Sequence, residues 1–249
     1  MRRRALAGRA SVLLSALAAL VLSGCSSFGA PAGGTTEGQD IDRLWKLFFV
    51  AGLVVGGIVI ALILWCVLRY RRRRGDKEEL PEQRGANVPV EVVYTVLPIL
   101  TVFALFAFTY ASDHRVEDLT PHPAVTVHVT GFQWQWRFDY VGQDVSVLGA
   151  PGSEPQLVLP ENETTRVVLT SNDVIHSFYV PGFLFKRDAI PGRVTQFDLR
   201  PDRVGVYRGE CAEFCGLDHA YMNFTVRVVP AAQFQSWISS QSNAASPAS

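Results

Sequence analysis

Two long uncharged runs in the N-terminal half of the chain limit its possible folds more than any other feature of the sequence. Leu47–Leu68 has 22 residues without a charge, and Val92–Ser112 has 21. A helix needs about 20 apolar residues to cross a hydrocarbon core of about 30 Å. Two buried helices of a globular protein are the alternative, but runs of this length with an Arg cluster between them disfavour it. We therefore expect a two-helix transmembrane hairpin over residues 41–112.

The charges beside these runs predict the orientation of the hairpin. Arg69–Arg74, with the sequence RYRRRR, follows the first run directly. Because clustered arginines next to a span stay on the cytoplasmic side, the first helix should run inward and the second outward. Lys77–Asn87 then forms a short internal loop, and everything after Ser112 lies outside. Pro98 is tolerable in the second helix if neighbouring groups satisfy the backbone.

The first 24 residues are typical of a secretory signal. Arg2–Arg4 and Arg9 precede the uncharged run Ala10–Ser23. The ending LSGC resembles a lipoprotein box, so we expect Cys25 to carry lipid and to be the mature N-terminus. An ordinary cleaved signal or an uncleaved anchor is the alternative. Residues 25–40, which contain the Gly/Ser/Thr/Pro/Ala-rich Ser26–Gln39, are expected to be a flexible linker.

After Ala124 the hydrophobic pattern changes to a period of two, which is typical of half-buried strands. Val125, Val127 and Val129 alternate with polar residues, and the alternation continues through Phe132–Tyr140. This places Trp134 and Trp136 on one strand face. Further short runs separated by turn residues predict a β-sandwich over residues 113–238, with a short helix at Ala231–Ile238. The Ser/Ala-rich residues 239–249 are expected to be disordered.

Charge is balanced overall but differs between the two parts of the chain. Through Ser112 there are 13 Lys and Arg against 8 Asp and Glu, and from Asp113 onward there are 10 against 15. The basic residues cluster beside apolar runs, so membrane topology explains them and nothing points to nucleic acid. A hydrophobic content of 48% with only 18% charged residues also favours a membrane protein.

A short segment, Gly209–Met222 with the sequence GECAEFCGLDHAYM, concentrates side chains that bind metals. Thiolates, an imidazole and a thioether suit copper better than a hard cation. A mononuclear blue-copper site needs only one Cys, so two thiolates that bridge two metals predict a dinuclear centre. A second imidazole is available from His176 in the segment NDVIHSFYV. The candidate side chains are Cys211, Cys215, His219, Met222 and His176.

Other interpretations of this segment are possible. Outside the cell Cys211 and Cys215 could form a disulfide, but this leaves His219, Met222 and Glu213 unexplained. A structural zinc site prefers Cys and His without Met. Met222 could fill a core, although the only other Met in the chain is Met1.

The pattern C-x-E-x-C-x-x-x-H-x-x-M resembles subunit 2 of the haem-copper cytochrome c oxidases. The segments DVIHSFYVPGF, KRDAIPGR and GFQWQW and the two apolar runs support the resemblance, which covers roughly Asp40–Trp237. It implies a fold of membrane α plus all-β, in which the helical hairpin precedes a cupredoxin-like β-sandwich.

The resemblance also implies a ligand set. Cys211 and Cys215 bridge two coppers. His219 and the carbonyl oxygen of Glu213 complete one copper site, and His176 and Met222 complete the other. The Glu213 carboxylate is expected to reach a magnesium ion at the junction with subunit 1.

The remaining implied roles concern electron and proton transfer. Electrons from a c-type cytochrome are expected to enter at Trp134 and to leave for haem in subunit 1, where oxygen is reduced to water with proton pumping. This chain then has no catalytic residue of its own. Glu91 is expected near the mouth of a proton pathway in that partner. The expected location is a bacterial plasma membrane, in contact with lipid and other oxidase subunits, with the copper domain on the outer face.

Two rival functions make different demands on the sequence. A quinol oxidase subunit would share the hairpin and the sandwich but would lack the copper ligands, which this chain has. A membrane-anchored copper carrier or sensor would need neither the two-span hairpin nor Glu91 and Glu213.

Overall fold

The computed structural model describes residues 29–31, 33–71, 85–150 and 152–245 of the chain. The predicted signal sequence, Cys25 and most of the loop between the two apolar runs lie outside the described residues. Contacts divide the chain into two compact units, one of Arg43–Asp118 and one of Met1–Asp42 with Leu119–Ser249. Each unit is described by itself below.

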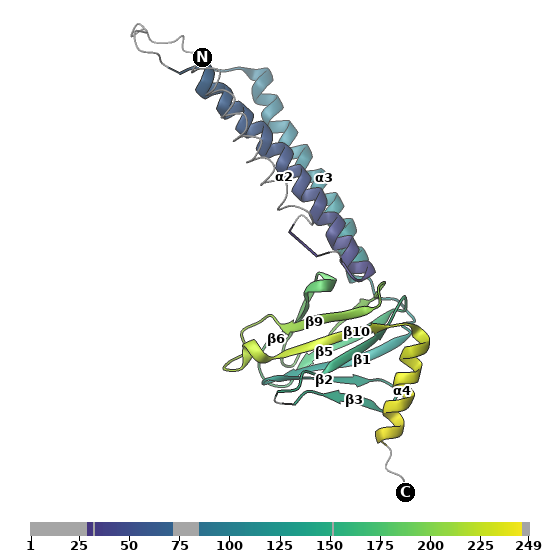
Figure 1. Ribbon diagram of the computed structural model, residues 1–249. Coiled ribbons are helices and arrows are strands. Elements are labelled where there is room, and N and C mark those ends of the chain that lie inside the picture. Colours follow the sequence, from purple (N-terminus) through teal and green to yellow (C-terminus); the bar gives the residue numbers. More distant parts are fainter. Residues whose placement is uncertain (1–28, 32, 72–84, 151, 246–249) are drawn as a thin grey trace, which may run out of the picture. The chain divides into compact units, whose positions relative to one another are not determined.

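Two long helices, α2 (Thr36–Arg69) and α3 (Val88–Glu117), contain the two apolar runs (Figure 1). Both are long and apolar enough to cross a membrane. They are longer than the runs because polar turns continue them at their ends. Asn87 begins α3 as its N-cap: its side chain accepts a hydrogen bond from the Val90 N–H, and its own N–H donates to the Glu91 carboxylate.

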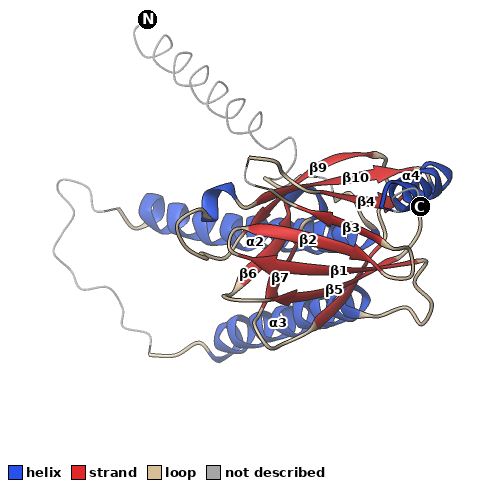
Figure 2. Ribbon diagram, turned by 90° about the horizontal axis from the view of Figure 1, so that it is seen from below, coloured by secondary structure: helices blue, strands red, loops and turns tan. Residues whose placement is uncertain are grey.

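The C-terminal unit is a sandwich of two five-stranded sheets (Figures 1 and 2). One sheet has the order β3-β2-β1-β5-β8 and the other β4-β10-β9-β6-β7. Most neighbouring strands are antiparallel, but β1 pairs in parallel with β5, and β4 with β10. The strands are β1 (Val125–Phe132), β2 (Gln135–Tyr140), β3 (Val145–Leu148), β4 (Gln156–Pro160), β5 (Thr165–Ser171), β6 (His176–Val180), β7 (Phe185–Ala189), β8 (Thr195–Leu199), β9 (Gly205–Cys211) and β10 (Asn223–Val229).

Aromatic rings from both sheets fill the space between them. Trp136 of β2 meets Phe178 of β6 and Phe224 of β10 edge to face, with ring centroids 6.2 and 5.5 Å apart. Phe178 and Phe224 stack on each other at 4.8 Å. All three rings are fully buried. Aromatic pairs of this kind contribute about 0.5–1.5 kcal/mol each beyond the burial of their surface, so these contacts stabilise the packing of the two sheets against each other.

The structure corrects the prediction that Trp134 and Trp136 share one strand face. β1 ends at Phe132, β2 begins at Gln135, and the two strands pair with Phe132 opposite Gln135. Gln133 and Trp134 therefore form the two-residue turn of a hairpin. Apolar alternation continued through the turn in the sequence, but the chain reverses there. Trp136 lies in the core, whereas Trp134 lies at the partly exposed end of the sandwich.

Two predicted boundaries are also wrong. The end of the expected flexible linker is folded: Thr35 is fully buried, Gly34 N–H donates to the Gly182 carbonyl at 2.9 Å, and α2 begins at Thr36. At the other end, α4 (Ala231–Ala245) extends into the tail that was expected to be disordered. Serine hydroxyls in α4 bond to carbonyls of its own preceding turn, so these polar groups have their partners within the helix.

Candidate metal centre

The candidate ligands meet because three strand ends lie at one edge of the β6–β9–β10 sheet. His176 begins β6 and Cys211 ends β9, and these neighbouring strands are antiparallel. Met222 lies directly before β10, and its carbonyl accepts a hydrogen bond from the Cys211 N–H at 3.1 Å. The loop between β9 and β10, which includes the 3-10 turn η2 (His219–Tyr221), brings the remaining donors back over the same edge.

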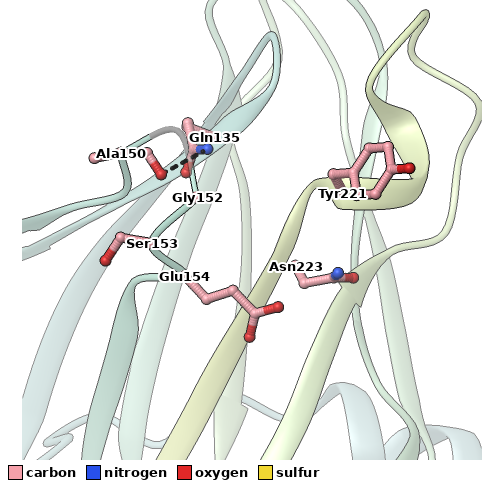
Figure 3. Close-up of a pocket in the computed structure, with 7 residues that line it drawn as sticks. All are labelled: Gln135, Ala150, Gly152, Ser153, Glu154, Tyr221 and Asn223. Carbon is pink, nitrogen blue, oxygen red and sulfur yellow. Dashed lines mark hydrogen bonds between the residues drawn. The ribbon is translucent and has the colours of Figure 1, made fainter.

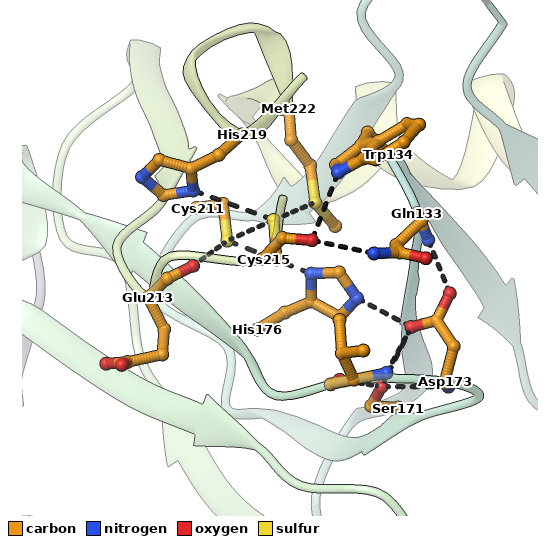
Figure 4. Close-up of polar contacts among 11 residues, drawn as sticks. Gln133, Trp134, Ser171, Asp173, His176, Cys211, Glu213, Cys215, His219 and Met222 are labelled. Carbon is orange, nitrogen blue, oxygen red and sulfur yellow. Dashed lines mark hydrogen bonds and ion pairs between the residues drawn. The ribbon is translucent and has the colours of Figure 1, made fainter. Parts of the chain in front are cut away.

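Sulfur and nitrogen atoms of these side chains converge on one another (Figure 4). Cys211 Sγ lies 3.9 Å from both Cys215 Sγ and His176 Nδ1. Cys215 Sγ lies 3.6 Å from His219 Nδ1 and 3.8 Å from Met222 Sδ. Ligand atoms around one tetrahedral metal at about 2.0–2.3 Å are about 3.3–3.8 Å apart, so the observed spacings suit shared metal coordination. Both cysteines are free thiols here, not a disulfide.

Glu213 presents different groups in two directions. Its carbonyl oxygen lies 3.3 Å from Cys211 Sγ. Its carboxylate points away from the sulfurs (Figure 4) and lies 3.9 Å from Lys186 Nζ, with the side chain about half exposed. The loop thus places the backbone of Glu213 at the candidate centre and its carboxylate at the surface.

Asp173 orients the buried imidazole of His176. His176 Nε2 lies 2.8 Å from Asp173 Oδ1, which leaves Nδ1 to face Cys211. The other oxygen, Oδ2, accepts from the Gln133 N–H at 2.7 Å, and these hydrogen bonds lower the pKa of Asp173 although burial opposes this. A carboxylate that fixes the ring in this way is the usual outer partner of a metal-binding His.

Gly131 at the end of β1 makes room for the imidazole. A Cβ there would lie 3.1 Å from the His176 ring and 3.2 Å from the Trp136 ring. The glycine therefore lets His176 pack directly over the β1–β2 hairpin, with its ring 6.1 Å from that of Trp136.

The pKa values of the two buried thiols differ because each meets different hydrogen bonds and charges. Burial favours the neutral thiol, but hydrogen bonds to His176 and to the backbone outweigh burial and lower the pKa of Cys211 to about 6. Burial and the charge on Cys211 raise the pKa of Cys215 to about 12. Burial also opposes the charged form of His176, but its bonds to Cys211 and Asp173 raise its pKa.

Trp134 contacts the loop that carries the cysteines. Its indole Nε1–H donates to the Cys215 carbonyl at 3.2 Å, and the side-chain amide of Gln133 donates to the same oxygen at 2.8 Å (Figure 4). Sequence reasoning singled out Trp134 but missed Gln133 and Asp173. The position of Asp173, three residues before His176, was the one available signal for it.

Two other predicted sites lie apart from this cluster. Glu91 is in the first turn of α3, where its carboxylate accepts the Asn87 N–H at 2.9 Å, so it has a helix-capping contact. Cys25 lies outside the described residues. Among described residues, the group of His, Cys and acidic side chains close enough to hold a metal is His176 with Cys211 and Cys215.

A hollow beside the centre separates the β2–β3 side from η2 (Figure 3). It has a volume of about 240 Å³, and an adjoining hollow of about 520 Å³ reaches Trp134, Asp218 and Tyr221. The described residues lining the first hollow include one carboxylate and no thiol or imidazole; they are Gln135, Ala150, Gly152, Ser153, Glu154, Tyr221 and Asn223. It is therefore a surface feature beside the metal-ligand cluster and not a second such cluster.

Comparison with known proteins gives concordant similarities. Residues 146–229 match the family model of the periplasmic domain of cytochrome c oxidase subunit II. The chain is 37% identical to a probable cytochrome c oxidase subunit 2 of Streptomyces avermitilis, over 94% of this chain and 86% of that protein. It is 33% identical to cytochrome c oxidase subunit 2 of Mycobacterium bovis, over 92% and 80%. The crystal structure of the periplasmic domain of subunit II from Bradyrhizobium japonicum aligns with 51% of this chain and 99% of that one, at 34% identity and a TM-score of 0.46.

Proposed function

Since this chain belongs to the cytochrome c oxidase subunit 2 family, part of an oxidoreductase complex, we propose that it accepts electrons from a c-type cytochrome and delivers them to haem in subunit 1. We further propose that oxygen is reduced to water there, with proton pumping. One observation carries the proposal: two thiols, two imidazoles, a thioether and a backbone carbonyl converge at one end of the sandwich.

The donor set fits a dinuclear copper centre (CuA). The two sulfurs lie between an imidazole on either side, and each has a further weak donor within 4 Å, the Glu213 carbonyl or the Met222 thioether. Soft sulfur donors with imidazoles select copper over magnesium or calcium. Cys211, Cys215, His176, His219, Met222 and the Glu213 carbonyl would hold the metals. Two coppers bound there would supply single-electron transfer with little change in geometry.

Trp134 is the proposed point at which electrons enter. Its indole is partly exposed, whereas Cys215 beneath it is buried. The hydrogen bond from Nε1–H to the Cys215 carbonyl joins the surface ring to a proposed ligand by one hydrogen bond and a few covalent bonds. This short route favours Trp134 over the fully buried Trp136, whose indole donates to the Met222 carbonyl at 3.3 Å.

The opposite side of the centre fits electron delivery. His219 and the Glu213 carboxylate both lie away from Trp134 in Figure 4. Half of the Glu213 side chain is exposed, and its salt bridge with Lys186 is long, so the carboxylate is accessible to a hard cation supplied jointly with subunit 1. We propose magnesium for that place, which would tie the loop from Cys211 to Met222, called the copper loop below, to the partner subunit.

The apolar helices and the outer domain agree with a membrane protein. We propose a bacterial plasma membrane, with Cys25 lipidated and Glu91 near the mouth of a proton pathway in the partner subunit. Glu91 already caps α3. A Glu91→Gln variant keeps an acceptor for the Asn87 N–H, so a loss of proton uptake in that variant would separate the pathway role from capping.

The test of the proposed function uses the full chain purified in its oxidase. We expect two coppers per chain and a paramagnetic signal shared equally by both. Trp134→Phe should slow oxidation of the c-type cytochrome without lowering the copper content. A single copper, or a signal localised on one metal, would refute the dinuclear assignment, and an unchanged rate in Trp134→Phe would refute the role of the indole.

Salt dependence tests how the donor docks. Asp173, Asp218 and Glu154 lie around the Trp134 end of the sandwich, and from Asp113 onward the chain has an acidic excess. A donor with a basic face should therefore associate more slowly as salt rises, because the Debye length falls from ~10 Å at 0.1 M to ~3 Å at 1 M. A salt-independent rate would refute electrostatic attraction between the donor and this acidic end, and would leave the role of Trp134 intact.

A further inference from the structure

The side chain of Gln133 makes a short hydrogen bond to the copper loop, which the β1–β2 turn itself does not require. It is the first residue of the β1–β2 turn, and its side chain is exposed. Its Nε2–H donates to the Cys215 carbonyl at 2.8 Å, shorter than the 3.2 Å bond from Trp134 to the same oxygen. A carbonyl oxygen has two lone pairs, so it can accept both bonds at once.

The main chain of Gln133 reaches the other ligand segment. Its N–H donates to Asp173 Oδ2 at 2.7 Å, and Asp173 Oδ1 lies 2.8 Å from His176 Nε2. Figure 4 shows these contacts on the Trp134 side of the sulfurs. One residue thus connects the segment that carries Cys215 with the segment that carries His176.

Gly216 shapes the copper loop to receive the amide. Its φ of +124° is a conformation that other residues rarely adopt, and a Cβ there would lie 3.2 Å from Gln133 Nε2 and 3.1 Å from the Trp134 indole. The loop therefore approaches the turn as closely as a residue without a side chain allows. Because Gln133 is exposed and fills no core, packing does not account for this approach.

We propose that Gln133 is a positioning residue for electron uptake: its amide holds the Cys215 carbonyl where the Trp134 indole N–H can bond to it. The inference rests on the proposed function. Without the amide, the carbonyl is held by the longer indole bond alone and can turn toward solvent. The indole then loses its hydrogen-bonded route to the Cys215 thiolate for part of the time.

The primary test is Gln133→Met in the full chain within the oxidase. Met has a similar length but no N–H donor. A neutral hydrogen bond is worth about 1 kcal/mol, so we expect electron uptake from the c-type cytochrome to slow by about fivefold. Copper content should stay at the wild-type value, because no proposed ligand is changed. Gln133→Glu, which keeps the shape but turns an acceptor toward the carbonyl, should slow uptake at least as much.

Gln135→Met is the matched control. Its amide also donates to a carbonyl, that of Ala150 at 3.3 Å, but it makes no bond to the copper loop. This variant should transfer electrons at the wild-type rate. A Gln133→Met variant that behaves like Gln135→Met would overturn the inference. Loss of copper from Gln133→Met would also overturn it, because Gln133 would then be a structural support of the metal loop.

A double-mutant cycle and a spectrum separate positioning from general damage. In a Trp134→Phe background the effect of Gln133→Met should vanish, since both changes break the same route. Paramagnetic NMR shifts of the Cys215 β-protons should move in Gln133→Met and not in Gln135→Met, because the carbonyl and the thiol share one Cα. Additive rate effects, or unmoved shifts, would contradict the inference. If Trp134→Phe itself changes nothing, the proposed electron route fails first, and the two failures are distinguishable.

Discussion

Replacing Asp173 with Asn should weaken copper binding although Asp173 is not a proposed ligand. Three donors lie within 2.8 Å of its two oxygens: His176 Nε2 at 2.8 Å and the Val174 N–H at 2.6 Å on Oδ1, and the Gln133 N–H at 2.7 Å on Oδ2. Asn has one acceptor oxygen, so its NH₂ group must face a donor at one of these positions. Either His176 or the turn at Gln133 then loses its partner.

The expected size follows from this geometry. Removing the outer partner of a metal-binding His typically costs about 10–100-fold in metal affinity, which corresponds to about 1.4–2.7 kcal/mol. A single lost hydrogen bond to a charged acceptor, at about 1.5–3 kcal/mol, falls in the same range. Because the Asp173 carboxylate holds the buried His176 ring with Nδ1 toward Cys211, we expect the loss to appear as a lower affinity for copper.

The assay is competition for copper between the purified full-length chain and a chelator of known affinity, followed by the visible spectrum of the copper-loaded protein. Asp218→Asn is the matched control. Asp218 lines the hollow that also includes Gln133 and Trp134, but its side chain makes no capping bond to η2. Asp173→Asn should lose copper at about 10–100-fold lower chelator concentration than Asp218→Asn does. An affinity within threefold of the control would refute the orienting role of Asp173.

Three further changes test the fold around the centre. Tyr140→Phe removes a buried hydroxyl that bonds both main-chain groups of one β4 residue, at 2.8 and 2.9 Å; it should lower the free energy of unfolding by about 1–3 kcal/mol in chemical denaturation, and a change below 0.5 kcal/mol would contradict this. Burial raises the pKa of Glu37, so its contribution to stability is fully present below the ordinary carboxyl pKa and is lost as pH rises through the raised value. Glu37→Gln should therefore flatten the decline of melting temperature with rising pH, and an unchanged profile would be evidence against a buried acid. Gly216→Ala should cost more stability than Gly142→Ala, because both have positive φ but only the first places a methyl against the Trp134 indole; equal melting temperatures would remove the steric argument.

Local patterns were sufficient for the coarse architecture. An uncharged run such as Leu47–Leu68 predicts a spanning helix because length and polarity alone decide whether a segment can lie in hydrocarbon. Period-two alternation likewise predicted a strand such as β1, and the expected fold class and family are confirmed. Most candidate ligands were readable for the same reason: Cys211, Cys215 and their neighbours occupy one short loop, so their proximity follows from chain connectivity.

Two strands were not expected from the sequence. β3 has only four residues, and β7 has three charged residues in a row, so neither has the pattern of a typical half-buried strand. Pairing with β2 and β6 makes them strands, and this pairing is a non-local property.

The arrangement around the centre was decided by contacts between distant segments. Phe132–Tyr140 reads as one alternating strand, yet pairing of β1 with β2 turns the chain at Trp134 and places the indole over a loop 81 residues away. Asp173 and Gln133 lie in two of the segments that resemble the family, DVIHSFYVPGF and GFQWQW, but neither had a role that could be read from the sequence. They matter because the antiparallel β6 and β9 bring His176 and Cys211 to one edge, beside the hairpin. Local sequence sets which segments can be helix, strand or ligand loop. Hydrogen bonds and burial between segments far apart in the chain set which side chains face each other, and single-residue patterns do not encode these contacts.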